Sequence, residues 1–158
     1  MPPKPIVFRK MTRDEFSKYR KLSLERYAQD IARNFSRPID EVRTEAKQQV
    51  RRILRNGLST PGHFLYNVLE KKTGETIGLI WFNVDADKKR VFLNDILIYQ
   101  PHRGKGYGRR TLELLETKLR NLGVTQFGLH VFAHNQVAVK LYKTRGFHTA
   151  SFKMRKDI

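Results

Sequence analysis

A hydrophobic segment that runs directly into a glycine-spaced basic loop, and then into an amphipathic helix, constrains this chain more than any other feature. The segment covers residues 93–99, and the loop carries Gly104, Gly106 and Gly108. Glycine permits the positive φ angles that turn successive amides toward one point, while the start of a helix adds unpaired amides and a positive dipole end. The pattern predicts an anion site. A phosphate-bearing ligand is favoured because the loop also carries cations, namely Arg103, Lys105, Arg109 and Arg110.

The spacing of the glycines excludes the two commonest phosphate-binding loops. A Walker loop requires Gly-Lys followed by Ser or Thr, which is absent from this segment. The dinucleotide fingerprint requires a third glycine where Arg109 stands. The pattern that remains is Arg103-x-x-Gly106-x-Gly108.

This remaining pattern resembles the acyl-CoA signature (Gln/Arg-x-x-Gly-x-Gly/Ala) of the GCN5-related N-acetyltransferase (GNAT) family. A second segment, residues 129–135 followed by Ala138, Leu141-Tyr142 and Gly146-Phe147, resembles the next motif of that family. The close resemblance covers residues 91–148. It implies an α/β fold with a GNAT-like mixed, largely antiparallel sheet, a central parallel strand-helix-strand unit and about four flanking helices. It also implies an N-acetyltransferase that takes acetyl from acetyl-CoA and passes it to a primary amine by direct attack.

The resemblance assigns cofactor-binding residues to three places. The diphosphate is expected on the loop, and the pantetheine arm is expected to add to the strand at Leu97 and Ile98. Asn135 resembles a residue that hydrogen-bonds the arm, although helix capping alone would also explain an Asn there. A bulky residue at Gly106 is expected to occupy the space where phosphate meets backbone. The loop positions that match the motif are Arg103, Gly104, Lys105, Gly106, Tyr107, Gly108 and Arg109.

Three residues are candidates for the proton transfers. Tyr142 matches the tyrosine that protonates the leaving thiolate in relatives, and the alternative is that it only packs in the core. Asp95 lies with Asn94 inside an otherwise apolar strand, where a polar pair suggests a bulge or a solvent-lined cleft and a possible general base. His130 stands where the ribosomal-protein branch of the family has a glutamate, which weakens assignment to that branch. It is either a base or a histidine bonded within the sheet. No metal site is expected, because metal-ligand spacing is absent among His63, His102, His134 and His148.

Local patterns predict the order of the secondary-structure elements. Thr12-x-x-Glu15 is a capping box that opens a helix, and Pro38 marks the first turn of the next. Gly123 ends the helix that follows the loop, and Asn135 caps the last one. The predicted strands cover residues 6–9, 63–71, 75–84, 91–99 and 126–132, with a final strand after Gly146-Phe147.

Composition limits the broader class of the protein. At 158 residues the chain is expected to form one domain, over residues 1–158. It has no cysteine, no signal-peptide pattern and no apolar stretch near the roughly 18 residues of a membrane span, so a cytoplasmic protein without membrane contact is expected.

The net charge of +17 favours contact with acidic partners or RNA, unless the basic surface only follows the charge balance of the host's proteins. A basic ridge could lie beside the acceptor, or these residues could form a solvated helix face. The acceptor is expected to be a small molecule or a protein, and the chain a monomer or homodimer. The ridge would comprise Arg43, Lys47, Arg51, Arg52 and Arg55.

Two other functions remain open at this point. A basic nucleic-acid-binding protein would use the glycine loop on phosphodiesters and would show a steep salt dependence. Against it, the aromatic residues fall mainly at core spacings, and no nucleic-acid-binding fold is evident. A non-catalytic acyl-CoA-binding regulator would bind acetyl-CoA without turnover on any amine.

Overall fold

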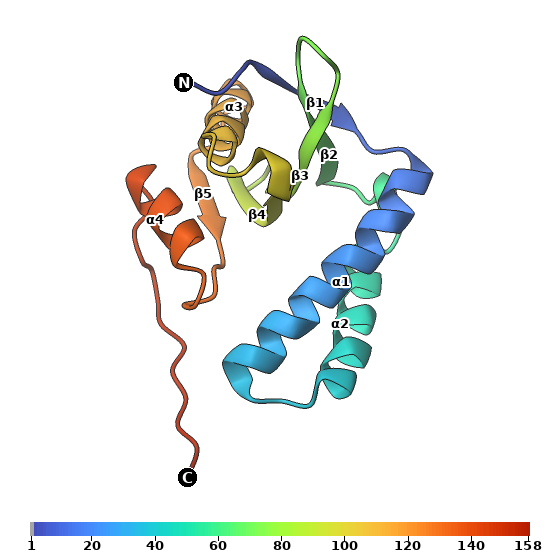
Figure 1. Cartoon of the computed structure of the whole chain (residues 1–158), viewed down its shortest axis with the longest axis vertical. Helices are drawn as coiled ribbons and strands as arrows, with labels where there is room; N and C mark the ends of the chain where they lie inside the picture. Colours follow the sequence, from blue (N-terminus) through green and yellow to red (C-terminus); the bar gives the residue numbers. More distant parts are fainter. Residues whose placement is uncertain (1) are drawn as a thin grey trace. The chain divides into compact units, whose positions relative to one another are not determined.

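The structure is a computed structural model, and it describes residues 2–158. The chain forms two compact units (Figure 1). The first takes in the chain up to Lys18 together with residues 54–130, and the second takes in residues 19–53 and 131–158. The single domain expected over residues 1–158 stays a prediction. The elements, in order, are β1 (Ile6–Lys10), α1 (Arg13–Phe35), α2 (Ile39–Ile53), β2 (His63–Glu70), β3 (Thr76–Asp85), β4 (Arg90–Ile98), α3 (Tyr107–Asn121), β5 (Gln126–Leu129) and α4 (Gln136–Thr144).

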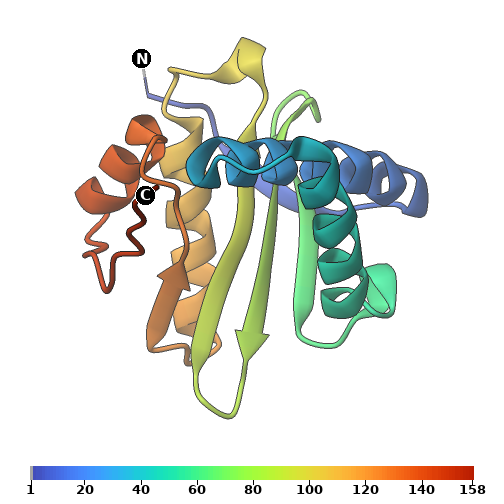
Figure 2. The ribbon, with the colours of Figure 1, turned by 90° about the horizontal axis from the view of Figure 1, so that it is seen from below.

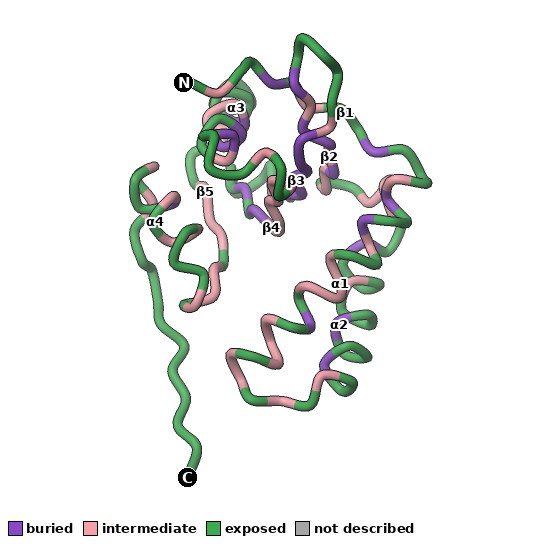
Figure 3. The backbone as a smooth tube through the Cα atoms, in the orientation of Figure 1, coloured by how far each residue is buried: buried purple, intermediate pink, exposed green. Residues whose placement is uncertain are grey.

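The first unit is built on a five-stranded mixed sheet in the order β1-β2-β3-β4-β5. All neighbours are antiparallel except β4 and β5, which are parallel and are joined through α3. Helix α3 packs beside β4 (Figure 2). Figure 3 shows buried positions along the strands of this sheet and along α3. The fully buried side chains of this unit include Ile77, Ile80, Leu112 and Leu115. The predicted fold class is therefore confirmed, with the parallel pair at one edge of the sheet.

Strand β4 carries a bulge at the polar pair that the sequence singled out. Trp81 pairs with Asp95 and Phe82 pairs with Leu93, so Asn94 is an extra residue on β4. The Asn94 amide Nδ2 donates to Asn83 Oδ1 at 2.8 Å. A bulge increases the local twist and redirects side chains. The irregularity expected at Asn94 and Asp95 is confirmed.

Strand β5 is shorter than predicted. It ends at Leu129, whereas the sequence pattern continues to Phe132. Its pairing with β4 stops at Leu93, the residue directly before the bulge. Apolar alternation shows which residues favour a strand, but the strand lasts only as long as its neighbour stays in register. The prediction for residues 130–132 was wrong for this reason.

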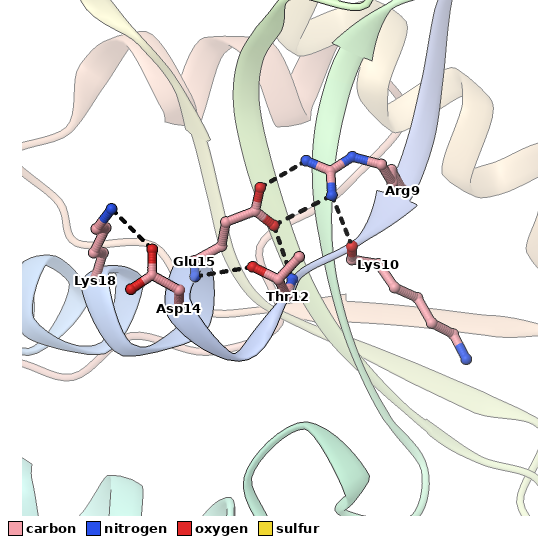
Figure 4. A network of polar contacts seen from close by, with 6 residues as sticks. All are labelled: Arg9, Lys10, Thr12, Asp14, Glu15 and Lys18. Carbon is pink, nitrogen blue, oxygen red and sulfur yellow. Dashed lines mark hydrogen bonds and ion pairs between the residues drawn. The ribbon is translucent and has the colours of Figure 1, made fainter.

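The start of α1 confirms the predicted capping box. The Glu15 amide donates to Thr12 Oγ1 at 3.2 Å, and the Thr12 amide donates to Glu15 Oε2 at 2.8 Å (Figure 4). Arg9 on β1 also binds the Glu15 carboxylate, at 2.7 Å. This hydrogen bond from Arg9 is the main cause of the lowered pKa of Glu15. The three residues fix the point where the chain leaves β1 and becomes helical.

The second unit contains most of α1, together with α2 and α4. Arg43 on α2 binds Glu25 at 2.8 Å and Asp40 at 2.8 Å, so it is held by carboxylates. In the expected basic ridge, the charge of Arg43 is therefore offset by Glu25 and Asp40. Lys47, Arg51 and Arg52 are exposed on the same helix.

The final strand that the sequence predicts is absent, because residues 145–158 form no helix or strand (Figure 1). Phe152 and Met154 are 84% and 90% exposed. A segment predicted to be a strand needs a neighbouring strand to pair with its backbone N–H and C=O groups. None of the described residues provides such a neighbour for residues 145–158. Within residues 2–158, no helix has the length and apolar character needed to cross a bilayer.

Candidate functional site

The glycine loop has the geometry of an anion cradle. A short 3-10 turn at Gln100–His102 precedes it, and Gly104 and Gly106 have φ angles of 71° and 81°. Gly106 is the N-cap of α3. Among the backbone hydrogen bonds of residues 2–158, none uses the consecutive amides from Gly106 to Arg109 as donors, and the first helical amide with an acceptor is that of Arg110. These amides fit the requirement of a diphosphate for converging N–H donors.

The two positive-φ glycines of the loop differ in how much room they leave for a side chain. A Cβ at Gly104 would meet nothing within 4 Å, whereas a Cβ at Gly106 would lie 3.3 Å from Pro3 Cδ. The expectation that a side chain at Gly106 would enter the phosphate space stays a prediction, and the structure adds that the Cβ would also meet the N-terminal segment. The positive φ of Gly106 is the second restriction on a side chain there.

The loop cations are partly engaged by the protein itself. Arg103 Nε donates to the Ile98 carbonyl at 2.8 Å, and Lys105 Nζ donates to the Pro101 carbonyl at 2.9 Å. Arg109 Nε binds Glu113 one turn along α3 at 3.0 Å, and Arg110 lies 3.6 Å from the same residue. Arg103 and Lys105 therefore each use one N–H group to bind a backbone carbonyl next to the loop. The charge of Arg109 is partly neutralised by Glu113.

The edge of β4 next to the loop has no strand partner. Pairing with β5 covers only residues 90–93, so no strand among the described residues pairs with Ile96–Ile98 on that side. On the other side, Leu97 pairs with Leu79 and Ile98 with Gly78. An extended chain can add to a free strand edge through backbone hydrogen bonds. Leu97 and Ile98 thus lie on an open edge that leads into the row of free amides.

Asp95 lies beside a pair of residues that the sequence analysis did not connect with it. Asp95 is the cross-strand partner of Trp81, so the two side chains share one face of the sheet. Trp81 Nε1 donates to His63 Nδ1 at 3.1 Å. This bond leaves the proton of the neutral imidazole on Nε2. No sequence signal joins residues 63, 81 and 95, because only strand register aligns them.

The half-buried position of His63 predicts a pH-dependent signal. Burial lowers the pKa of His63 below its usual 6.5. The depressed pKa means that His63 stabilises the fold fully above pH 6.5, and that this contribution is lost as the pH falls through the lower, folded-state pKa. Trp81 is the single tryptophan of the chain. Its fluorescence is expected to change with a midpoint below pH 6.5, as protonation of His63 removes its hydrogen-bond acceptor.

His63→Asn is the control for this titration, since the Asn carbonyl can still accept from Trp81 but does not titrate. The variant should give a flat fluorescence signal over the same pH range. A wild-type midpoint at or above pH 6.5, or the same change in the variant, would contradict the assignment.

His130 lies just beyond β5 and is exposed. The pairing of β5 with β4 ends at Leu129, the residue before it. Both interpretations of His130, as a base and as a histidine bonded within the sheet, stay predictions, as does the role of Asp95 as a base. Among residues 2–158 no group of His, Cys, Asp and Glu has metal-binding geometry.

Tyr142 and Asn135 lie in the second unit, on α4 and at its cap. Asn135 Oδ1 accepts from the Ala138 amide at 3.2 Å, so the capping function is confirmed. Tyr142 is 8% exposed, and its ring meets Phe147 edge-on at 5.7 Å. The hydroxyl as proton donor and Asn135 as a cofactor ligand stay predictions.

The same unit holds a polar cluster that the sequence analysis missed. His134 Nδ1 lies 2.9 Å from Asn34 Nδ2, and His134 Nε2 lies 3.4 Å from Asp30 Oδ1. These contacts join α1 to the segment that precedes α4. The two helical residues are four apart on one face of α1, but nothing in the sequence indicates that they meet a histidine 100 positions away.

Comparison with known proteins identifies the class to which this fold and loop belong. The model of the acetyltransferase (GNAT) family matches residues 23–147, and the chain belongs to this family. Its members use acetyl-CoA as acetyl donor.

Particular relatives resemble almost the whole chain. It is 31% identical over 155 residues to the Bacillus subtilis (strain 168) uncharacterized N-acetyltransferase YycN, covering 97% of this chain and 99% of that protein. The crystal structure of YycN is 30% identical, with a TM-score of 0.92 over 98% of this chain and 99% of the other. A second B. subtilis (strain 168) relative, the uncharacterized N-acetyltransferase YdgE, is 30% identical over 94% of this chain and 95% of that protein.

A more distant structure shares the fold alone. Spermidine N-acetyltransferase from Vibrio cholerae, in complex with CoA and spermine, is 19% identical. Its TM-score is 0.59, and the match covers 89% of this chain and 79% of that one.

Proposed function

We propose that this chain is an N-acetyltransferase that moves the acetyl group of acetyl-CoA to a primary amine by direct attack. The observation that carries the proposal is the open β4 edge at Ile96–Ile98, which runs into the row of free amides from Gly106 to Arg109. This arrangement supports a ligand with an extended amide-bearing arm that ends in a diphosphate.

Different residues bind the two parts of the cofactor, the diphosphate and the pantetheine arm. The loop residues from Arg103 to Arg109 bind the diphosphate, chiefly through backbone amides, and the β4 edge at Leu97 and Ile98 takes the arm. Asn135 provides a further polar contact to the arm. When bound, acetyl-CoA supplies a thioester carbonyl carbon that an amine can attack.

Two proton transfers accompany the exchange of bonds. As the C–N bond forms and the C–S bond breaks, Tyr142 gives its phenol proton to the departing sulfur. Asp95 or His130 takes the proton that the amine loses, directly or through water. No covalent enzyme intermediate is needed, and the sequence has no cysteine to form one.

The acceptor is an amine-bearing small molecule or protein. The net charge of +17 favours an acceptor that carries acidic groups near its amine, since a polycationic acceptor would be repelled.

Calorimetric titration with acetyl-CoA, CoA and ATP at near-physiological salt tests the cofactor site. We expect both CoA species to bind with micromolar dissociation constants and ATP to bind much more weakly, because ATP has no arm to add to β4. If neither CoA species binds while RNA binds with a steep salt dependence, the proposal fails and a nucleic-acid-binding function replaces it.

Turnover is then measured on panels of amines by detecting the free thiol of released CoA. The absence of cysteine gives this assay no background from the protein. CoA binding without turnover on any class of amine would instead support a non-catalytic regulator.

A further inference from the structure

Two carboxylates flank the turn between β2 and β3, and they face opposite ends of the glycine loop. Glu70 is the last residue of β2 and Glu75 directly precedes β3. The turn is closed by backbone bonds from the Glu70 amide to the Glu75 carbonyl and from the Gly74 amide to the Glu70 carbonyl, both 2.9 Å long. The two carboxylates therefore have a defined separation before they meet the loop.

Glu70 holds the end of the loop that becomes α3. Its side chain is 6% exposed, and its Oε2 accepts from the hydroxyl of Tyr107, the first residue of α3, at 3.3 Å. Burial, and then the charge of Glu70, raise the pKa of Tyr107, so the phenol keeps its proton and donates it. Lys4 Nζ lies 3.3 Å from the other oxygen of Glu70. The buried carboxylate is thus satisfied from two sides, as a buried charge requires.

Glu75 holds the other end. Its Oε1 lies 3.3 Å from Nε2 of His102, the last residue of the 3-10 turn before the loop. The His102 side chain is 17% exposed, and its ring meets the Tyr107 ring edge-on at 6.3 Å. The two loop ends therefore contact each other as well as the turn.

The N-terminal segment adds a third support. The Pro5 carbonyl accepts from the Lys71 amide in the turn at 2.8 Å, and Pro3 is the neighbour that a Cβ at Gly106 would meet. The segment from Pro3 to Pro5 thus connects the turn with the N-cap of α3.

We propose that the β2–β3 turn is a bracket for the cofactor loop, in which Glu70 and Glu75 are positioning residues that act through Tyr107 and His102. The inference rests on the proposed function. A loop with positive-φ glycines has many alternative conformations, and holding both ends reduces the entropy lost when its amides converge on a ligand. The bracket accordingly contributes to CoA affinity without touching CoA.

Tyr107→Phe and Glu75→Ala test the bracket in the full chain. Each substitution removes one anchor, whereas a glutamine at position 75 could still accept a hydrogen bond from His102. We expect each to raise the Kd for CoA about 2- to 10-fold, the range for one hydrogen bond or ion pair, and the double variant to raise it further. Hydrogen exchange of the His102, Arg103 and Arg110 amides, which have backbone acceptors at the two ends of the loop, should become faster in both variants when it is measured without ligand. This local measurement separates a positioning role from a general loss of stability.

Asp85→Ala is the matched control, because it removes a carboxylate in the same way at the β3–β4 turn, where Asp85 pairs with Lys88 at 3.8 Å. It should leave both the Kd and the exchange of the loop unchanged. If Tyr107→Phe lowers the melting temperature, the result for Glu75→Ala decides whether the bracket positions the loop, since the side chain of Glu75 is 58% exposed.

The two proposals fail in different ways. Unchanged Kd in both variants, with normal binding by the wild type, would overturn the bracket alone. Absence of CoA binding by the wild type would overturn the proposed function.

Discussion

Replacement of Gly106 by valine is expected to weaken CoA binding on the order of 100-fold, or about 2.7 kcal/mol. Gly106 has a φ of 81°, which a β-branched residue adopts only with strain, and the added Cβ would lie 3.3 Å from Pro3. The N-cap of α3 must therefore shift, and the amides from Gly106 to Arg109 would no longer converge. The expected loss lies near the upper end of the range for one hydrogen bond to a charged group, about 1.5–3 kcal/mol. Calorimetric titration with CoA measures it.

Gly123→Val provides the matched control at the other end of α3. Gly123 also has a positive φ, of 75°, but a Cβ there would meet nothing within 4 Å. Both variants should lose about 1–3 kcal/mol of stability from backbone strain, and only Gly106→Val should lose CoA affinity. Equal CoA affinity in the two variants would show that the loop conformation is not needed for binding.

Tyr142→Phe is expected to lower kcat on the order of 100-fold with CoA affinity changed by less than about twofold, the low end of the range for losing a general acid. The ring of Tyr142 is buried and packs on Phe147, and phenylalanine keeps this packing. Only the hydroxyl is lost, so the departing sulfur would lack its proton donor. Steady-state kinetics with an active amine, using thiol detection, gives the comparison.

Tyr66→Phe is the control for the loss of a half-buried tyrosine hydroxyl. Tyr66 stacks on Phe8 at 5.9 Å within the sheet, and its hydroxyl has no assigned role. Its variant should retain wild-type turnover. If Tyr142→Phe also retains full turnover, Tyr142 is a packing residue and the proton comes from elsewhere.

Features governed by contiguous residues were predictable from the sequence. The capping box at Thr12 and Glu15, the Asn135 cap and the glycine loop are each set by a few neighbouring side chains or backbone angles, so their patterns indicated the structure directly. The bulge at Asn94 belongs to the same group, because a polar pair inside an apolar strand marks a local irregularity.

Features that need a distant partner were mispredicted or missed. Residues 130–132 and the C-terminal segment have strand-like patterns, but a strand requires a neighbour in register, and neither segment has one. The His134 contacts with Asp30 and Asn34 cross 100 positions and have no local signature.

The sequence by itself determined the anion loop and the family to which the chain belongs, because the positive-φ glycines and the helix start act within one short segment. Only the tertiary structure decided what surrounds that loop. The open β4 edge, the pairing of Asp95 with Trp81, and the anchoring of the loop by Glu70 and Glu75 all depend on strand register and on the docking of turns. These contacts join residues whose separation along the chain carries no information about their distance in the fold.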